Sequence, residues 1–463
     1  MNSFAGFPGM PGFFQEVYEE LDFKNGDLVE VKDTAKLGEE EYIDKSQWLE
    51  LCRYIGKNNT FKPEAIFFVE NNPVIVFVEG TAEDQDRLHE IYNRLWCMAN
   101  PRLLFISTPV ELNVYDLAGK PARKLEDLKP LETVKKTAAV ASALKNYRRE
   151  RVESGEVFGD ERFGKIDSRA DKTLINDIKI VRNRLLQAGL DGARLKYAHA
   201  LIGRSIFIRY LEDRGILTKD YFYQAAGDNS RWKEILEEPV SKPSFQLGIE
   251  GLYYRKVLAD IDFTYRLYEK LAEDFNGDMF PSDQNERNAV KQEHLLLLKK
   301  FLSGEQDQEL LFFWAYKFDI IPIELISNIY EELYHAGNIK RESIHGTHYT
   351  PTSLVDFVLK KVLIPDRLKT KPRVIDPACG SGIFLVEAFR RIVRYELYKR
   401  GSGNLSFNEL ENILKNQIGG IELNEEAVRI TAFSLYLAFL HYQEPPDILQ
   451  QIKDGNKLPN LIY

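Results

Sequence analysis

The sequence has few of the features that cross-link or export a chain. Its 463 residues include only three cysteines, Cys52, Cys97 and Cys379, which are far apart. Three widely spaced cysteines favour neither a disulfide framework nor a paired-cysteine zinc site, and a reducing compartment suits them. The first thirty residues also lack a basic segment followed by a hydrophobic stretch and a small-residue cleavage site. We therefore expect a cytoplasmic protein.

Long hydrophobic runs and an excess of positive charge are also missing. No run of 18 or more uncharged apolar residues is present, so no membrane span is predicted. Lys and Arg number 62 against 71 Asp and Glu, for a net charge of -9. Because phosphate neutralisation requires clustered cations, this balance excludes a protein that coats DNA, and DNA contact would use local patches. One basic cluster could follow a phosphate backbone or form a solvated helix face: Lys135, Lys136, Lys145, Arg148, Arg149 and Arg151.

The length and composition indicate several domains, because 463 residues with 44% hydrophobic content are more than a single hydrophobic core accommodates. Residues 1–125 alternate between short β-rich runs and helical runs, which predicts a small α/β domain. The expected helices cover 47–55 and 83–98, and the expected strands cover 64–69, 74–79, 103–107 and 111–115, with a hairpin turn at 71–73.

Residues 126–345 have apolar residues at helical spacing, which predicts a mostly helical connector. Its clearest helix covers 197–214 and is expected to end at Gly215, a residue that tolerates positive φ. Residues 346–463 return to strand and helix alternation, which predicts a parallel sheet unit. Its expected strands cover 373–375 and 417–421, and its expected helices cover 383–399, a segment after the Ser406 and Glu409 capping box, and 424–441.

The strongest motif is the run Val374 to Gly382, in which a short strand enters a glycine-rich turn that begins a helix. Ligands of open α/β sheets bind at such strand ends. Gly380 and Gly382 allow a tight turn and a close approach by a ligand. Asp376 could accept from a ligand amino group, or it could only cap the turn. Glu422, at the end of the next strand, could accept both hydroxyls of a ribose.

The spacing of the glycines and of the second acid disfavours a nicotinamide cofactor. The run Asp376-Pro377-Ala378-Cys379-Gly380-Ser381-Gly382 instead resembles the cofactor loop of adenine-N6-specific DNA methyltransferases of bacterial and archaeal restriction-modification systems. Gly346 to Pro351 resembles the upstream cofactor segment of these enzymes, and Glu422 matches their ribose-binding acid. The order of these motifs is that of the methyltransferases whose cofactor half precedes their catalytic half. The chain thus resembles type IIG and type I modification enzymes.

The resemblance implies a fold, a cofactor and a set of site residues. The fold is an incomplete Rossmann-like, S-adenosylmethionine-dependent methyltransferase region at 346–463, preceded by the helical domain at 126–345. Thr350 is expected to cap a helix whose first residue is Pro351, leaving N–H groups for the methionine carboxylate. Cys379 is expected to be a small turn residue rather than a nucleophile. The implied cofactor-binding residues are Tyr349, Thr350, Pro351, Asp376, Pro377, Ala378, Cys379, Gly380, Ser381, Gly382, Glu422 and Leu423.

The family's catalytic motif, an Asn or Asp followed by Pro-Pro and an aromatic residue, is absent from the sequence. Glu444-Pro445-Pro446-Asp447 lacks both the amide and the ring. We expect a fragment that binds cofactor without transferring methyl, with Leu461 to Tyr463 forming a strand that precedes the motif. Double-stranded DNA is the implied substrate, with the target adenine flipped out of the duplex. A specificity or restriction subunit is a further implied partner.

Residues 1–125 also resemble, weakly, the PD-(D/E)xK nuclease core. Glu64 and Glu79 stand at the acidic positions and would bind Mg²⁺. Thr81 stands where the motif has a lysine, which indicates a degenerate nuclease. Two alternatives to the methyltransferase therefore remain: a fused restriction endonuclease and a non-catalytic assembly subunit.

Overall fold

The computed structural model divides into two units, Met1–Lys172 and Thr173–Tyr463, and each is treated by itself. No helix in the described part of the chain is long and apolar enough to cross a membrane. The structure describes residues 13–57, 63–81, 85–119, 121–122, 124–135, 140–164, 169–239, 253–275, 283–303, 316–323, 325, 329, 350–401 and 403–462.

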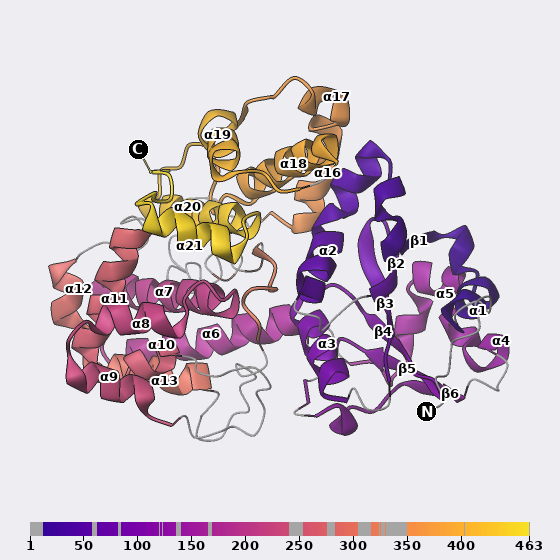
Figure 1. The fold of residues 1–463 in the computed structure, drawn as a ribbon, viewed down its shortest axis with the longest axis horizontal. Helices are drawn as coiled ribbons and strands as arrows, with labels where there is room; N and C mark the ends of the chain where they lie inside the picture. Colours follow the sequence, from indigo (N-terminus) through magenta and orange to yellow (C-terminus); the bar gives the residue numbers. More distant parts are fainter. Residues whose placement is uncertain are drawn as a thin grey trace, which may run out of the picture. The chain divides into compact units, whose positions relative to one another are not determined.

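A six-stranded sheet forms the centre of the first unit, with its strands in chain order (Figure 1). Neighbouring strands are antiparallel except β3 and β4, which are parallel and are connected through α3 (Gln85–Cys97). A parallel pair requires such a crossover. The strands are β1 (Asp27–Glu30), β2 (Pro63–Val69), β3 (Asn72–Glu79), β4 (Leu103–Ser107), β5 (Glu111–Asp116) and β6 (Glu132–Lys135).

Most side chains of β2, β3 and β4 are buried on both sheet faces, because helices cover each face (Figure 1). Aromatic residues dominate one face, where Tyr18 packs edge-on against Phe77 at 5.0 Å between ring centroids. The helices on this face are α1 (Phe13–Glu20), α4 (Val140–Ala143) and α5 (Arg149–Glu153), and those on the other are α2 (Glu39–Lys57) and α3. The boundary expected near residue 125 falls inside this unit, because β6 pairs with β5 and segments as far as Phe163 join the same core.

The hairpin between β2 and β3 turns earlier than the sequence suggested. The central turn residues are Glu70 and Asn71, with φ of 49° and 66°, whereas Pro73 already pairs with Phe68 in the sheet. Two successive positive φ angles give a turn whose twist matches that of the strands. The expected turn at 71–73 was therefore wrong.

The second unit begins with helices that pack around α7 (Leu195–Asp213), which is buried on nearly all sides. Such a helix is the centre of a helical core. It ends as expected, with Gly215 at φ 72°. The surrounding helices are α6 (Ala170–Gln187), α8 (Lys219–Ala226), α9 (Ser230–Glu237), α10 (Tyr253–Val257), α11 (Ile261–Asp274), α12 (Gln284–Ala289) and α13 (Gln292–Ser303).

His199 of α7 gives this core a dependence on pH. Its Nε2 accepts a hydrogen bond from Arg182 Nε at 3.2 Å, and burial, with the Arg182 charge, lowers the pKa of His199 to about 4. Because the unfolded chain takes up this proton near pH 6.5, stability is full above that pH and falls towards pH 4. Lowering the pH from 6.5 to 4.5 should reduce the free energy of unfolding of His199→Gln by about 2 kcal/mol less than it reduces that of wild type. Urea unfolding at the two pH values measures both reductions, and equal reductions in the two proteins would contradict the prediction.

The last part of the second unit contains the parallel strands β7 (Val374–Asp376) and β8 (Ile418–Gly420). The capping box of Ser406 and Glu409 is present at the start of α19, as expected. The helices are α16 (Thr352–Val362), α17 (Pro365–Leu368), α18 (Ile383–Arg400), α19 (Phe407–Gln417), α20 (Glu425–His441) and α21 (Pro445–Lys453). Helix α18 contacts both strands as well as α16, α19 and α20.

Glu444 caps α21, and Pro445 and Pro446 lie in its first turn, where no backbone N–H is needed. One expectation for this part was wrong, because Leu461 and Ile462 form no strand. Tyr436 instead donates its hydroxyl proton to the Pro459 carbonyl at 2.9 Å, which holds this segment against α20.

Helix α20 is also fixed to the end of α7. Arg214 donates to the carbonyl oxygens of Leu440 at 2.8 Å and Gln443 at 2.6 Å. Leu440 lies in the last turn of α20, and Gln443 lies just after its end. Phe207 of α7 packs edge-on against Phe433 of α20, with ring centroids 5.8 Å apart. The position of α20 is therefore set by α7.

Candidate functional site

The glycine turn between β7 and α18 requires glycine for two different reasons. Gly380 and Gly382 have φ of 53° and 82°, a region that other residues rarely adopt. A Cβ at Gly380 would meet open space, whereas a Cβ at Gly382 would lie 2.6 Å from Thr431 Cγ2. Conformation alone thus selects glycine at 380, and both conformation and packing select it at 382.

Backbone hydrogen bonds join this turn to the segment after β8. Ile421 N donates to the Asp376 carbonyl at 2.9 Å, and Cys379 N donates to the Ile421 carbonyl at 3.0 Å. Gly420 permits the close approach, because a Cβ there would lie 2.9 Å from Cys379 Sγ. The two strand ends and the loops that follow them therefore form one structure.

Asp376 caps the turn and keeps one oxygen available. Its Oδ1 accepts from Ala378 N at 3.1 Å, so the local capping interpretation holds for that oxygen. Within the described residues, Oδ2 has no hydrogen-bond partner. The side chain is partly exposed. Asp376 can therefore accept a further hydrogen bond at the mouth of the turn.

Glu422 connects the two loops through its carboxylate. Its Oε2 accepts from Gly380 N at 3.0 Å, and its Oε1 accepts from Asn424 N at 2.9 Å. Asn424 in turn caps α20 by accepting from Glu426 N at 2.9 Å. Each carboxylate oxygen can accept a second hydrogen bond. Glu422 thus orders the turn and retains capacity for two hydroxyl donors.

Cys379 is a buried thiol within the turn. Burial raises the pKa of the Cys379 thiol, a hydrogen bond with Thr431 opposes this, and the charges of Asp376 and Glu422 raise it further. A thiol with a raised pKa stays protonated near neutral pH and is a poor nucleophile. The structure therefore favours a packing role for Cys379.

The remaining candidate residues occupy the rim of the turn or lie apart from it. Pro377 and Ala378 are exposed, Ser381 is buried, and Leu423 is 99% exposed. The expected start of the upstream helix needs correction: Pro351, with ψ 139°, is the cap of α16, and Thr350 precedes it. Tyr349 lies outside the described residues, as does the boundary at 345/346.

The sequence interpretation did not find Thr431. This residue lies on α20, 49 positions after Gly382, and its hydroxyl donates to the Gly380 carbonyl at 2.8 Å. A single threonine within an apolar helix carries no sequence signal of such a contact. Only the packing of α20 against the turn shows it.

The acids proposed as a nuclease remnant lie at the ends of two adjacent strands of the first unit. Glu64 lies at a bulge of β2, and Glu79 ends β3. Burial raises the pKa of Glu64, and the charge of Glu79 raises it further. No group of three metal-ligating side chains occurs among the described residues.

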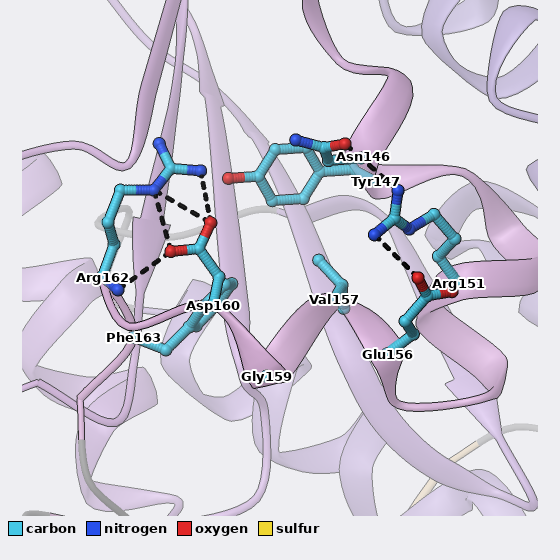
Figure 2. A pocket seen from close by; sticks show the side chains of 9 residues that line it. All are labelled: Asn146, Tyr147, Arg151, Glu156, Val157, Gly159, Asp160, Arg162 and Phe163. Atoms are coloured by element: carbon cyan, nitrogen blue, oxygen red, sulfur yellow. Dashed lines mark hydrogen bonds and ion pairs between the residues drawn. The ribbon is translucent and has the colours of Figure 1, made fainter.

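A cavity of about 350 Å³ in the first unit contains none of the cofactor-loop residues (Figure 2). Arg162 at its edge donates to Asp160 at 2.8 Å and to Glu132 at 2.9 Å, and Arg151 pairs with Glu156 at 3.0 Å. Their charges are therefore neutralised internally. Arg149, of the basic cluster, likewise pairs with Asp22 at 2.6 Å. For the basic cluster, the ion pairs of Arg149 and Arg151 favour a solvated helix face over a surface that follows a phosphate backbone.

Comparisons with known proteins find similarity to DNA methyltransferases. Residues 359–459, which include the glycine turn and Glu422, match the family described as MmeI, DNA-methyltransferase domain. A putative type II restriction enzyme and methyltransferase, RM.MjaORFECS2P from Methanocaldococcus jannaschii, is 22% identical over 58% of this chain and 26% of its own length. Adenine-specific methyltransferase PglX from Streptomyces coelicolor is 24% identical over 54% of this chain and 20% of its own.

The chain therefore covers about a quarter or less of the length of these curated relatives. Among solved structures, the cryo-EM structure of a DrdV–DNA complex aligns with 83% of this chain and 34% of that chain. Its TM-score is 0.31 and its sequence identity is 13%.

Proposed function

Because this chain is related to the methyltransferases of restriction-modification systems, we propose that its last part binds S-adenosylmethionine for methyl transfer to adenine N6 in DNA. One observation carries the proposal: two carboxylates from adjacent strand ends flank a glycine turn, and both retain acceptor capacity. Ligands of parallel sheets bind at this edge.

Each part of the cofactor has a candidate partner in this arrangement. Asp376 Oδ2 would accept from the amino group, and Glu422 would accept from the two ribose hydroxyls. The N-terminal N–H groups of α16, after Pro351, would bind the methionine carboxylate. Leu423, exposed beside Glu422, would pack against the adenine ring of the cofactor.

Adenine N6 as the methyl acceptor is supported by the resemblance of the loop and by the name of one relative. A flipped adenine would have to be held by an amide followed by prolines and an aromatic ring, and these 463 residues contain no such tetrapeptide. We therefore propose that this chain binds the methyl donor without transferring its methyl group. Duplex DNA and a specificity or restriction subunit are its proposed partners.

Calorimetric titration with S-adenosylmethionine tests the proposal. We expect wild type to bind and Asp376→Ala to bind roughly 10- to 100-fold more weakly, because one hydrogen bond to a charged group is lost. Asp366→Ala is the matched control, since Asp366 pairs with Lys369 on the surface of α17. An assembly subunit that kept only the fold would give no heat with any variant, and that result would remove the proposal.

A further inference from the structure

Thr431 contacts the glycine turn at two places. Its Oγ1 donates to the Gly380 carbonyl at 2.8 Å. Its methyl carbon Cγ2 would lie only 2.6 Å from a Cβ on Gly382, so the methyl group packs closely against that glycine. The side chain is only 7% exposed, so water does not compete for these contacts.

The backbone of Gly380 is restrained at both its N–H and its C=O. Glu422 accepts from its N–H, and Thr431 donates to its C=O. Both restraining residues belong to the segment that runs from the end of β8 into α20. Arg214 fixes the far end of that helix, and Asn424 caps its beginning. The residues that restrain the turn therefore belong to a segment whose helix is fixed at both ends.

We propose that Thr431 is a positioning residue for the methyl donor, an inference that rests on the proposed function. A turn with two glycines has more backbone freedom than a turn built from residues with a Cβ, and ordering it on binding would reduce affinity. Thr431 orders it in advance, so that Gly380 and Gly382 present a fixed backbone surface to the ligand. It touches the turn and not the cofactor.

Three substitutions separate the hydroxyl from the methyl group. Thr431→Val keeps the shape and removes the hydrogen bond to Gly380, and we expect it to weaken S-adenosylmethionine binding about tenfold. Thr431→Ser keeps the hydroxyl, and we expect its affinity to stay within about twofold of wild type. Thr431→Ala removes both groups and should resemble the valine variant. Calorimetry on each full chain, with circular dichroism to verify folding, gives these values.

Amide hydrogen exchange without ligand provides an independent readout. We expect residues 379–382 to exchange faster in Thr431→Val than in wild type or Thr431→Ser. Should the valine variant not fold, weaker binding by the alanine than by the serine variant supports the inference, and equal binding overturns it.

The outcomes distinguish the two proposals. Wild type that binds no S-adenosylmethionine would end the proposed function and the role of Thr431 together. Wild type that binds, with a valine variant of equal affinity and unchanged exchange, would overturn the role of Thr431 alone.

Discussion

Glu422→Ala is expected to weaken S-adenosylmethionine binding by at least about 100-fold, the largest effect on binding among the substitutions considered. The substitution removes the two proposed ribose contacts. It also removes the acceptors of Gly380 N and Asn424 N, so the turn and the start of α20 lose their connection before any ligand arrives. Calorimetric titration measures the loss.

Two variants refine this result. Glu422→Gln retains one acceptor oxygen but points its amide protons at a backbone N–H, so intermediate affinity is expected. Glu411→Ala is the control, because Glu411 forms a surface pair with Lys415 on α19 and should leave binding unchanged. Equal affinity of wild type and Glu422→Ala would exclude Glu422 from the site.

Glu286→Ala is expected to lower the free energy of unfolding by about 3 to 5 kcal/mol, the largest effect on stability. Arg204 of α7 donates to both carboxylate oxygens of Glu286 at 2.6 and 2.7 Å, and each side chain is only 4% exposed. Tyr265 also donates to Glu286, at 3.0 Å. Removing the carboxylate leaves a buried guanidinium without its counter-charge. Urea unfolding followed by circular dichroism measures the change.

Two further variants are compared with Glu286→Ala: a double substitution that removes both buried charges, and a substitution that breaks an ion pair on the surface. Arg204→Met with Glu286→Leu removes both charges and should cost far less than Glu286→Ala alone, since the desolvation penalty is removed with the pair. Lys415→Ala breaks an exposed pair and should cost less than about 1 kcal/mol. A Glu286→Ala variant as stable as wild type would show that Arg204 finds another acceptor.

The sequence identified the features that depend on neighbours along the chain. The strand entering the turn at Gly380 and Gly382, the end of α7 at Gly215 and the capping box of Ser406 are confirmed, because each is specified within a few residues. The resemblance to restriction-modification methyltransferases is likewise confirmed by the comparisons. The role of each cofactor-binding residue stays a prediction.

Tertiary structure decided what depends on residues far apart in sequence. Thr431 reaches the turn across 49 positions from Gly382, and Arg214 binds the carbonyl of Leu440 across 226. Composition and periodicity do not encode such contacts, because they arise only when packed helices bring the side chains within hydrogen-bonding distance. The sequence alone thus determined the chemistry offered at the strand ends, and the packing of α20 between α7 and the turn determined how rigidly that chemistry is presented.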